Sequence, residues 1–484
     1  MKYVYLAVYA AILVSVGIYS RRKVKTLNDF FLGGRTMGAW MSAFSYGTAY
    51  FSAVIFIGYA GKIGWGFGIS SVWIGLGNAF IGSLLAWLVI GRRTRRVTQQ
   101  MNVSTMPEFF EKRYGCKNLK ILSAIMVFVF LVPYSASVYS GLSYLFEAIF
   151  GIPFYLGMLI MAVLTAIYLV LGGYFATALS DFIQGIIMFV GIIFVIAYTL
   201  AAPQVGGLAA GLQKLQAIDP KLAAPIGPAG WWPLLSLVVL TSLGSWGLPQ
   251  MVHKFYAIKD EKAINKGTII STVFALLIAG GAYFVGSFGH LFLKEVPIDA
   301  VTGAKNFDMI MPQLLQSALP DMLIGIVVVL VLSASMSTLA SLVLVSSSAI
   351  SIDLFGILAP NAKDITKRRL MRVLCGVFVA LSFFLALGKF TTIITLMSIS
   401  WGTLSGAFLA PFLYGLYWKK TTKIGAWSGV VVGLVMSIVL NFMVPGINSP
   451  MAGTITMATT LVLVPIVSLL TPKYSTEFTN QFNI

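Results

Sequence analysis

The stretch SYGTAYFS, residues 45–52, interrupts an apolar run that is otherwise long enough to cross a membrane. It is rich in hydroxyl groups, and Ala49 is its only strong helix former. A second apolar run contains GSWGLP at 244–249, where the proline removes a helix hydrogen bond and the glycines permit unwinding. Irregular backbone inside a bilayer requires protein or a cavity to satisfy its polar groups. The two stretches are therefore binding segments or, alternatively, places where small residues let helices pack closely.

Both breaks lie in a chain whose composition is that of an integral membrane protein. Of its 484 residues, 58% are hydrophobic and 10% are charged, whereas about 25% are charged in an ordinary soluble domain. This composition argues against a cytosolic enzyme. The net charge of +18 comes from short basic clusters between apolar runs, which argues against a nucleic-acid-binding surface. Two cysteines and two histidines are too few for a disulfide framework or a His-based metal centre.

About thirteen apolar runs have the length of a membrane-spanning helix, roughly 20 residues. Each broken run opens a block of five runs. The sequence therefore predicts an all-α polytopic membrane protein with two inverted five-helix repeats, one leading helix and two trailing helices. The runs lie near 3–20, 38–60, 66–90, 119–148, 154–176, 180–201, 232–256, 266–293, 322–352, 371–388, 390–418, 424–444 and 452–471. The prediction divides the chain into five regions. They are the leading helix with a first cytoplasmic loop (1–37), the first repeat (38–201), an extracellular loop (202–231), the second repeat (232–418), and the trailing helices with a cytoplasmic tail (419–484).

The basic residues predict the orientation of the chain. Most of the 33 Lys and Arg lie in one set of connections, which includes 21–37, 91–120 and the C-terminal tail. Cytoplasmic loops carry such an excess, so we expect the N-terminus outside and the C-terminus in the cytoplasm. The predicted location is the cytoplasmic membrane, with the lipid bilayer as a partner and no nucleic acid. The oligomeric state is left open.

A hydroxyl cluster and one acid point to a cation site. The run near 322–352 contains SASMSTLAS at 333–341, the densest group of hydroxyls in the chain. Uncharged oxygens suit a monovalent cation because they replace its hydration shell without trapping it. Close packing of small residues is the alternative. Asp181 is the one acid that we expect to point into the bundle, where acids are usually functional, although Ser180 and Asp181 would also suit a helix N-cap.

The sequence lacks the motifs expected if protons or ATP drove transport. No chain of intramembrane acids and histidines suggests a proton relay, and no GxxxxGK[ST] segment suggests an ATP-driven pump. No nucleophile–base pair stands out, so we expect neither an enzyme nor an organic cofactor. These features favour a secondary transporter.

Four motifs, in this order, resemble those of the sodium:solute symporter family. They are FFLGGRTMG (30–38), YLVLGGYFATALSDFIQG (168–185), SMSTLASLVLVSSSAISIDL (335–354) and GLYWKKTTKIGAWSGVVVGLV (415–435). The resemblance covers nearly the whole chain, from about residue 3 to residue 471. It implies a leucine-transporter-like architecture of two inverted repeats, with Na⁺ as the coupling ion.

The resemblance also implies which residues bind sodium. The implied ligands are the backbone carbonyls of Thr48, Phe51 and Ala334 and the hydroxyls of Ser337 and Thr338. Asp181 would lie close behind this site. Some members hold a second sodium with the aspartate and two further serines. The corresponding positions here are Ala340 and Ser341, so only part of that second site is present.

The solute is predicted less directly. Proline-type members carry an Asp where this chain has Tyr50, sugar-type members carry polar side chains where it has Val54 and Ile55, and sialic-acid-type members use an Arg that segment 121–146 lacks. These differences argue against proline, sugars and sialic acid as the solute. TAYFSAVIFIG (48–58) and LQAIDPKL (215–222) look most like the pantothenate branch. A small carboxylate could be held by half-helix N-termini. The predicted solute-binding residues, between the two broken helices, are Ser52, Tyr134, Ser245, Trp246 and Pro249.

The sequence thus predicts a sodium-coupled symporter that imports a small organic solute, such as pantothenate, by alternating access. Two alternatives remain open at this point. One is a proton-coupled importer of the same fold, and the other is a membrane sensor or channel that does not couple transport to an ion.

Overall fold

The helix that carries residues 45–52 is interrupted at the predicted place. α3 (Ala39–Tyr50) ends at Phe51, whose backbone is extended (φ −110°, ψ 107°). Helical backbone resumes in η2 (Val54–Tyr59). The hydroxyl-rich stretch therefore forms the end of one half-helix and the gap before the next.

The computed structural model describes residues 2–21, 26–299 and 303–474, and these residues form helices without a β-strand. The predicted all-α class is confirmed. The elements up to the extracellular loop of the prediction are α1 (Lys2–Arg21), α2 (Leu27–Leu32), η1 (Gly33–Arg35), α3, η2, α4 (Ala60–Phe67), η3 (Gly68–Ser71), α5 (Val72–Ala79), η4 (Phe80–Leu85), η5 (Trp87–Gly91), α6 (Arg92–Gln100), α7 (Met106–Tyr114), α8 (Lys117–Phe150) and α9 (Phe154–Ala201). The remaining elements are α10 (Leu208–Ile218), η6 (Pro220–Ala223), α11 (Trp231–Ser242), η7 (Leu243–Gly247), α12 (Pro249–Tyr256), α13 (Glu261–Gly286), α14 (Gly289–Phe292), η8 (Phe307–Met309), α15 (Ile310–Ala318), α16 (Asp321–Ser348), η9 (Ala349–Leu354), α17 (Phe355–Leu358), α18 (Asp364–Leu387), α19 (Ile393–Tyr417), α20 (Lys423–Phe442) and α21 (Ser449–Leu470).

The second break lies between η7 and α12, where the helical stretch Trp231–Gly247 (α11 and η7) and α12 bend by 46° with respect to each other. Leu248 is extended (φ −85°, ψ 123°) and Pro249 opens α12. A proline disfavours helical backbone at the residue before it, and its missing N–H costs nothing in the first turn. Gly247 instead permits close packing, because a Cβ there would lie 2.9 Å from the backbone nitrogen of Leu409 in α19. Unwinding and close packing are thus both present in this segment.

The predicted number of spans is not confirmed. Nine helices in the described ranges are long and apolar enough to cross a membrane, or ten when the bent pair of α11–η7 and α12 counts as one span. Val4–Ser20 and Phe154–Ile167 are apolar but shorter, and one continuous helical stretch, Val54–Gln100, contains parts of two predicted runs. The end of the predicted cytoplasmic tail, 475–484, lies outside the described residues.

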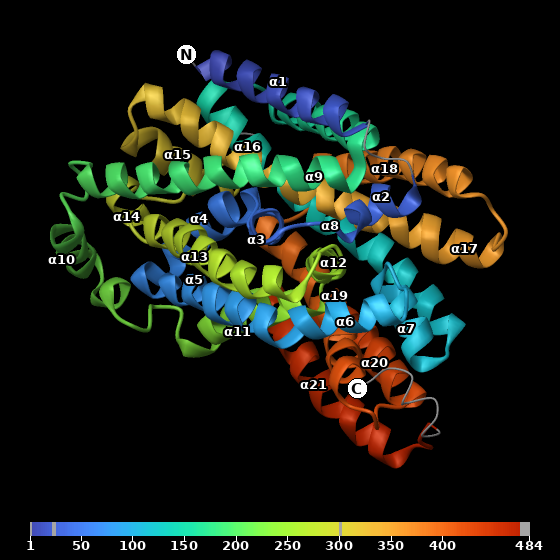
Figure 1. Ribbon diagram of the computed structural model, residues 1–484. Coiled ribbons are helices and arrows are strands. Elements are labelled where there is room, and N and C mark those ends of the chain that lie inside the picture. Colours follow the sequence, from blue (N-terminus) through green and yellow to red (C-terminus); the bar gives the residue numbers. More distant parts are fainter. Residues whose placement is uncertain (1, 22–25, 300–302, 475–484) are drawn as a thin grey trace.

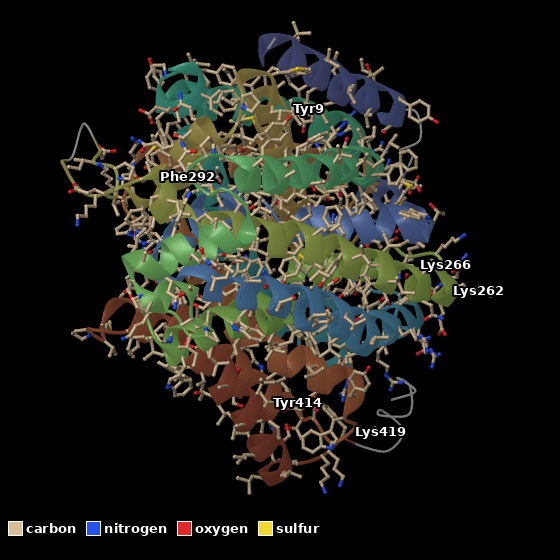
Figure 2. All side chains as sticks on the ribbon, turned by 90° about the vertical axis from the view of Figure 1, so that its left-hand side faces the viewer. Tyr9, Lys262, Lys266, Phe292, Tyr414 and Lys419 are labelled. Carbon is tan, nitrogen blue, oxygen red and sulfur yellow. The ribbon has the colours of Figure 1, made fainter. Side chains whose placement is uncertain are left out.

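The bundle places both breaks at its centre. Figure 1 shows α3, α8 and α16 inside, with α1 lying along α9 at one edge and with α20 and α21 at the opposite edge. α12 contacts both α3 and α16, and η7 contacts α19. Figure 2 shows Lys262, Lys266 and Lys419 at one end of the molecule and Phe292 at the other.

One glycine divides α9 into two helices. Gly173 has φ 55° and ψ −149°, a conformation that residues with a side chain rarely adopt. A Cβ at this position would also lie 2.7 Å from the carbonyl oxygen of Phe30. The resulting kink lies near the end of the predicted run 154–176, shortly before the predicted run 180–201 begins. It also begins the half of α9 that brings Asp181 into the bundle.

Candidate functional site

The end of α3 and the middle of α16 meet through hydroxyl and carbonyl oxygens. Thr338 Oγ1 lies 3.1 Å from the carbonyl oxygen of Thr48 and 3.3 Å from that of Ala49, and can donate to either. Ser337 Oγ donates to the Thr48 hydroxyl over 2.7 Å. The last four carbonyls of a helix have no partner within it, so the break leaves backbone oxygens free for a cation. Buried, uncharged oxygens of this kind fit sodium.

Two other residues that were predicted to bind sodium, Ala334 and Phe51, lie next to this cluster. Ala334 is buried on α16, one turn before Thr338. Phe51 lies at the break, where its ring stacks on that of Tyr50 with the centroids 4.3 Å apart. The sequence-based prediction missed Ala49, whose carbonyl lies at Thr338, because only the exact end of α3 shows which carbonyls face α16. The ligand roles of this set stay a prediction.

Asp181 is fully buried and lies beside this cluster. It accepts a short hydrogen bond from Ser45 Oγ of α3, and its Oδ2 lies 3.4 Å from Nζ of Lys254 in α12. The residue lies well inside the helical stretch that follows the kink at Gly173, so the interpretation of Asp181 as a helix cap is wrong. The prediction also missed Lys254, which by its place near a span end resembles an interfacial lysine.

Asp181 is not the only acid inside the described bundle, contrary to the prediction. Asp353 is fully buried and accepts from Thr105 Oγ1 over 2.7 Å. Asp308 is 4% exposed and accepts from the backbone N–H of Ile393, at the start of α19, over 3.2 Å. These contacts anchor segments outside the two breaks, so neither acid contributes to the cluster around Thr48.

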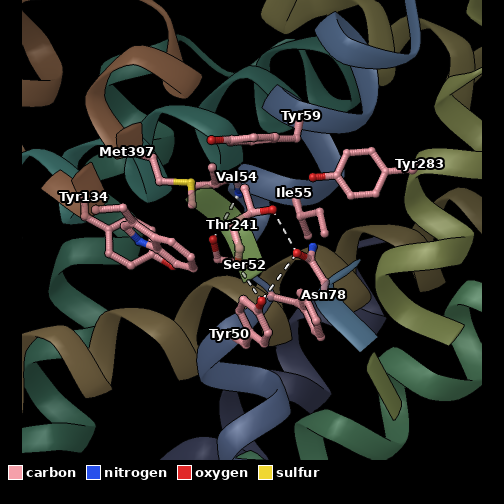
Figure 3. A pocket seen from close by; sticks show the side chains of 12 residues that line it. Tyr50, Ser52, Val54, Ile55, Tyr59, Asn78, Tyr134, Thr241, Tyr283 and Met397 are labelled. Carbon is pink, nitrogen blue, oxygen red and sulfur yellow. Dashed lines mark hydrogen bonds between the residues drawn. The ribbon is translucent and has the colours of Figure 1, made fainter. Parts of the chain in front are cut away.

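A closed pocket lies on the other side of the α3 break. Its cavity volume is about 20 Å³, room for about one water molecule, and the side chains that line it are at most 7% exposed. Figure 3 shows the rings of Tyr50, Tyr59, Tyr134 and Tyr283 around Ser52. No acidic or basic side chain belongs to the lining, which consists of Tyr50, Phe51, Ser52, Val54, Ile55, Tyr59, Asn78, Tyr134, Thr241, Tyr283, Met397 and Trp401.

Asn78 joins the two broken helices at the floor of this pocket. Its Oδ1 accepts hydrogen bonds from Thr241 Oγ1 (2.9 Å) and Ser242 Oγ (3.1 Å), and lies 3.4 Å from the hydroxyl of Tyr50. The Tyr50 hydroxyl also donates to the carbonyl of Thr241. Because Tyr50 belongs to α3 and Thr241 to α11, the two half-helices are tied together where they frame the pocket.

The pocket also contains a donor for an anionic group. Trp401 lines the pocket, and its Nε1 is buried without a hydrogen-bond partner in the described structure. A buried N–H that lacks an acceptor costs about 1–3 kcal/mol, so a carboxylate at this position would recover that cost. Trp401 was not predicted, because a tryptophan in an apolar run looks like ordinary packing.

The predicted solute residues separate into two groups. Ser52 and Tyr134 line the closed pocket. The other three lie outside it: Ser245 Oγ donates to the carbonyl of Ser242 (2.8 Å), Trp246 Nε1 donates to the carbonyl of Ile81 (3.0 Å), and Pro249 borders a different cavity beside His253. The second broken helix therefore contributes to the pocket through Thr241 of α11, which precedes the break, and not through the residues of GSWGLP (244–249).

Comparisons with known proteins show which transporters this chain resembles. The high-affinity proline transporter PutP of Bacillus subtilis is 30% identical over 483 residues, covering 97% of this chain and 98% of that protein. The osmoregulated proline transporter OpuE of the same organism is 29% identical over 88% of this chain and 86% of its own. A sodium/proline symporter of Staphylococcus aureus is 29% identical over 90% of this chain and 85% of its own.

Solved structures support the fold. A Na⁺-coupled sialic acid symporter in a substrate-bound, outward-open state superposes with a TM-score of 0.82 at 16% identity and covers 98% of both chains. A nucleobase-cation-symport-1 family transporter in a closed conformation gives a TM-score of 0.56 at 13% identity, covering 94% of this chain and 98% of that one. The family model of the sodium:solute symporter family matches residues 30–433. Its members and the relatives above are transporters and not enzymes, and the present chain belongs to the sodium:solute symporter family.

Proposed function

We propose that this chain is a sodium-coupled symporter that imports proline. The observation that carries the proposal is the position of the α3 break between two sites. Thr48 and Ala49 present their carbonyls to the hydroxyl of Thr338 on one side, and Phe51 and Ser52 line the closed pocket on the other. An ion that orders this break removes an ordering cost that the solute would otherwise bear, which couples the two binding events.

Proline replaces pantothenate as the proposed solute. The relatives described above are named as proline transporters, whereas the likeness to pantothenate carriers rested on two short stretches. The closed pocket has a cavity volume of about 20 Å³, far below the roughly 300–1,000 Å³ of ligand sites, so it must widen to admit a solute. A compact amino acid requires less widening than an extended carboxylate.

The pocket recognises a zwitterion without a charged side chain. Tyr50, which stands where proline-type members carry an Asp, uses its hydroxyl on Thr241 and Asn78. The solute carboxylate accepts from Trp401 Nε1 in our proposal, and the secondary ammonium lies against the tyrosine rings and the carbonyls freed at the break. Cation–aromatic contacts of this kind contribute about 2 kcal/mol or more when they are desolvated.

One sodium ion supplies sufficient energy for accumulation. Its entry at a membrane potential of ~100 mV provides ~2.3 kcal/mol, and a tenfold sodium gradient adds about 1.4 kcal/mol. Together these permit roughly 500-fold accumulation of a solute without net charge. The proposed residues for sodium are those predicted from the sequence, Thr48, Phe51, Ala334, Ser337 and Thr338, with Ala49 in addition.

The proposed topology in the cytoplasmic membrane has thirteen spans: one leading helix, two inverted five-helix repeats and two trailing helices. Lys262, Lys266 and Lys419 lie at one end of the bundle (Figure 2), and cytoplasmic surfaces carry such an excess of basic residues. This end faces the cytoplasm in our proposal, so that the N-terminus is outside and the C-terminus is inside.

Uptake into proteoliposomes tests the function. We expect labelled proline to accumulate under an inward sodium gradient and to fail to accumulate under an inward proton gradient without sodium. Proton-driven uptake would instead support the proton-coupled alternative. This is the most specific rival, because the buried pair of Asp181 and Lys254 contains two groups that can exchange protons. Excess unlabelled pantothenate should not compete. Sodium-independent equilibration of proline would favour a channel.

A further inference from the structure

Lys254 is a lysine in the interior of the bundle. It lies in the last turn of α12, and its side chain is 2% exposed. Its Nζ donates to Ser45 Oγ and Ser341 Oγ, each at 2.9 Å, and lies 3.4 Å from Asp181 Oδ2. An ammonium group has three donors and no acceptor, so these three oxygens match its hydrogen-bonding capacity.

The three oxygens form a cage from three separate helices. Ser45 belongs to α3, Asp181 to α9 and Ser341 to α16, and Lys254 reaches them from a fourth, α12. The ring of Tyr174 closes one side, with its centroid 5.3 Å from Nζ. Asp181 Oδ1 is buried without a hydrogen-bond partner in the described structure. The carboxylate therefore has a second oxygen that is available to a cation. One carboxylate and two hydroxyls are also a suitable ligand set for a free monovalent cation.

The cage lies one helical turn from the proposed sodium site. Ser45 precedes Thr48 by one turn on α3, and Ser341 follows Thr338 by one turn on α16, so the two oxygen clusters share both helices. We propose that the ammonium of Lys254 is a tethered cation that fills a second cation site, and thereby limits the carrier to one free sodium ion per cycle. The inference rests on the proposed sodium coupling and adds its stoichiometry.

The test is the number of sodium ions that the purified protein binds. We expect Lys254→Ala to bind two ions where the wild type binds one, measured with ²²Na⁺ at equilibrium. The denaturation midpoint of the variant should rise about twice as steeply with the logarithm of the sodium concentration, with choline replacing sodium at constant ionic strength. A folded variant that still binds one ion would overturn the proposal.

Two further variants keep the result decisive. Lys254→Ala/Asp181→Asn removes both charges and should bind one ion, and a count of two there would contradict the role of the carboxylate. Lys120→Ala is the matched control, because Lys120 is also a buried lysine, 2.8 Å from Glu111 and 3.9 Å from Asp353, but lies outside the cage. Its count should stay at one, and a rise to two would contradict the proposal.

Failure to fold is also informative. If Lys254→Ala folds only at high sodium concentration, the ion replaces the lost ammonium, as proposed. If no sodium concentration restores folding while the double variant folds, the cage does not accept a free ion and the inference is wrong. If the wild type binds no sodium at all, the proposed function is contradicted instead. If, in that case, Lys254→Ala does bind sodium, the result would still support the cage as a cation site.

Discussion

The hydroxyl of Thr338 on α16 lies within hydrogen-bonding distance of the carbonyl of Thr48, 3.1 Å away at the last turn of α3. This contact joins a continuous helix to the helix that is interrupted beside the closed pocket. Whatever binds at these oxygens therefore acts directly on the backbone that leads to Ser52. The relationship gives the proposed sodium site a defined set of atoms that mutation can remove one at a time.

The first prediction concerns the two hydroxyls of α16. Ser337→Ala and Thr338→Ala should each raise the sodium concentration for half-maximal uptake by about 10–100-fold, because a contact to a charged group is worth about 1.5–3 kcal/mol. The KM for proline at saturating sodium should change less. Ser335→Ala is a suitable control, since Ser335 Oγ donates to the carbonyl of Val331 in its own helix. Unchanged sodium dependence in the Ser337→Ala/Thr338→Ala double variant would refute the site.

A second prediction separates the charge of Asp181 from its shape. Asp181→Asn leaves Lys254 without its counter-charge, one turn from the sodium oxygens. Two like charges roughly 6 Å apart repel by about 3 kcal/mol at an effective dielectric constant of about 20, so sodium affinity measured by binding should fall at least about tenfold. Lys254→Ala/Asp181→Asn should recover most of the loss. If the double variant stays as weak as Asp181→Asn, Asp181 acts on sodium directly and not through Lys254.

The third prediction tests the pocket donor. Trp401→Phe removes the Nε1–H and keeps most of the aromatic surface, so proline affinity should fall by about 10–100-fold if the carboxylate accepts from this group. Sodium binding without proline should be unaffected. Trp87→Phe provides the control, because Trp87 Nε1 is also buried without a partner in the described structure but lies outside the pocket. Equal effects of the two substitutions on proline affinity would argue against a contact with the carboxylate.

A fourth prediction uses Asp308, which lies outside the membrane-spanning segments. Burial raises the pKa of this carboxyl from 3.8 to about 6. The folded protein therefore binds the proton more tightly than the unfolded chain, and stability rises as the pH falls from 7 through 6. This group should add about 1 kcal/mol of stability between pH 7 and pH 5.

The contribution of Asp308 is measured as a difference between two proteins. The apparent denaturation temperature of the wild type should rise relative to that of Asp308→Asn when the pH changes from 7 to 5 at fixed sodium concentration. The asparagine keeps an oxygen that can accept from the N–H of Ile393, so the variant should fold. Parallel pH responses of the two proteins would show that Asp308 does not titrate in this range.

The features predicted well are those set by local residue chemistry. A run of hydroxyl-bearing residues inside an apolar segment predicted a break within residues 45–52, which the structure places at Phe51, and Pro249 predicted the bend after Leu248. Family motifs directed attention to Ser337 and Thr338, which do meet α3. In each case the information lies within a few residues of the feature itself.

The features that were missed depend on how distant segments meet. Lys254 looks interfacial in the sequence, and only the packing of α12 against α3 and α16 shows that its ammonium is enclosed. Trp401 and Asn78 look like packing residues until the fold places them on the pocket. The predicted division into spans differs from the structure here because α4, η3 and α5 continue one into the next without a polar break.

The lining of the closed pocket has an electrical consequence. It contains no acidic or basic side chain, and the nearby charges of Asp181 and Lys254 have opposite sign. A carrier of this kind moves almost no charge of its own when it returns unloaded from one side of the membrane to the other. In the proposed cycle, the inward step with sodium and zwitterionic solute then carries the whole transport current. The membrane potential should therefore accelerate this loaded step and leave the rate of return unchanged.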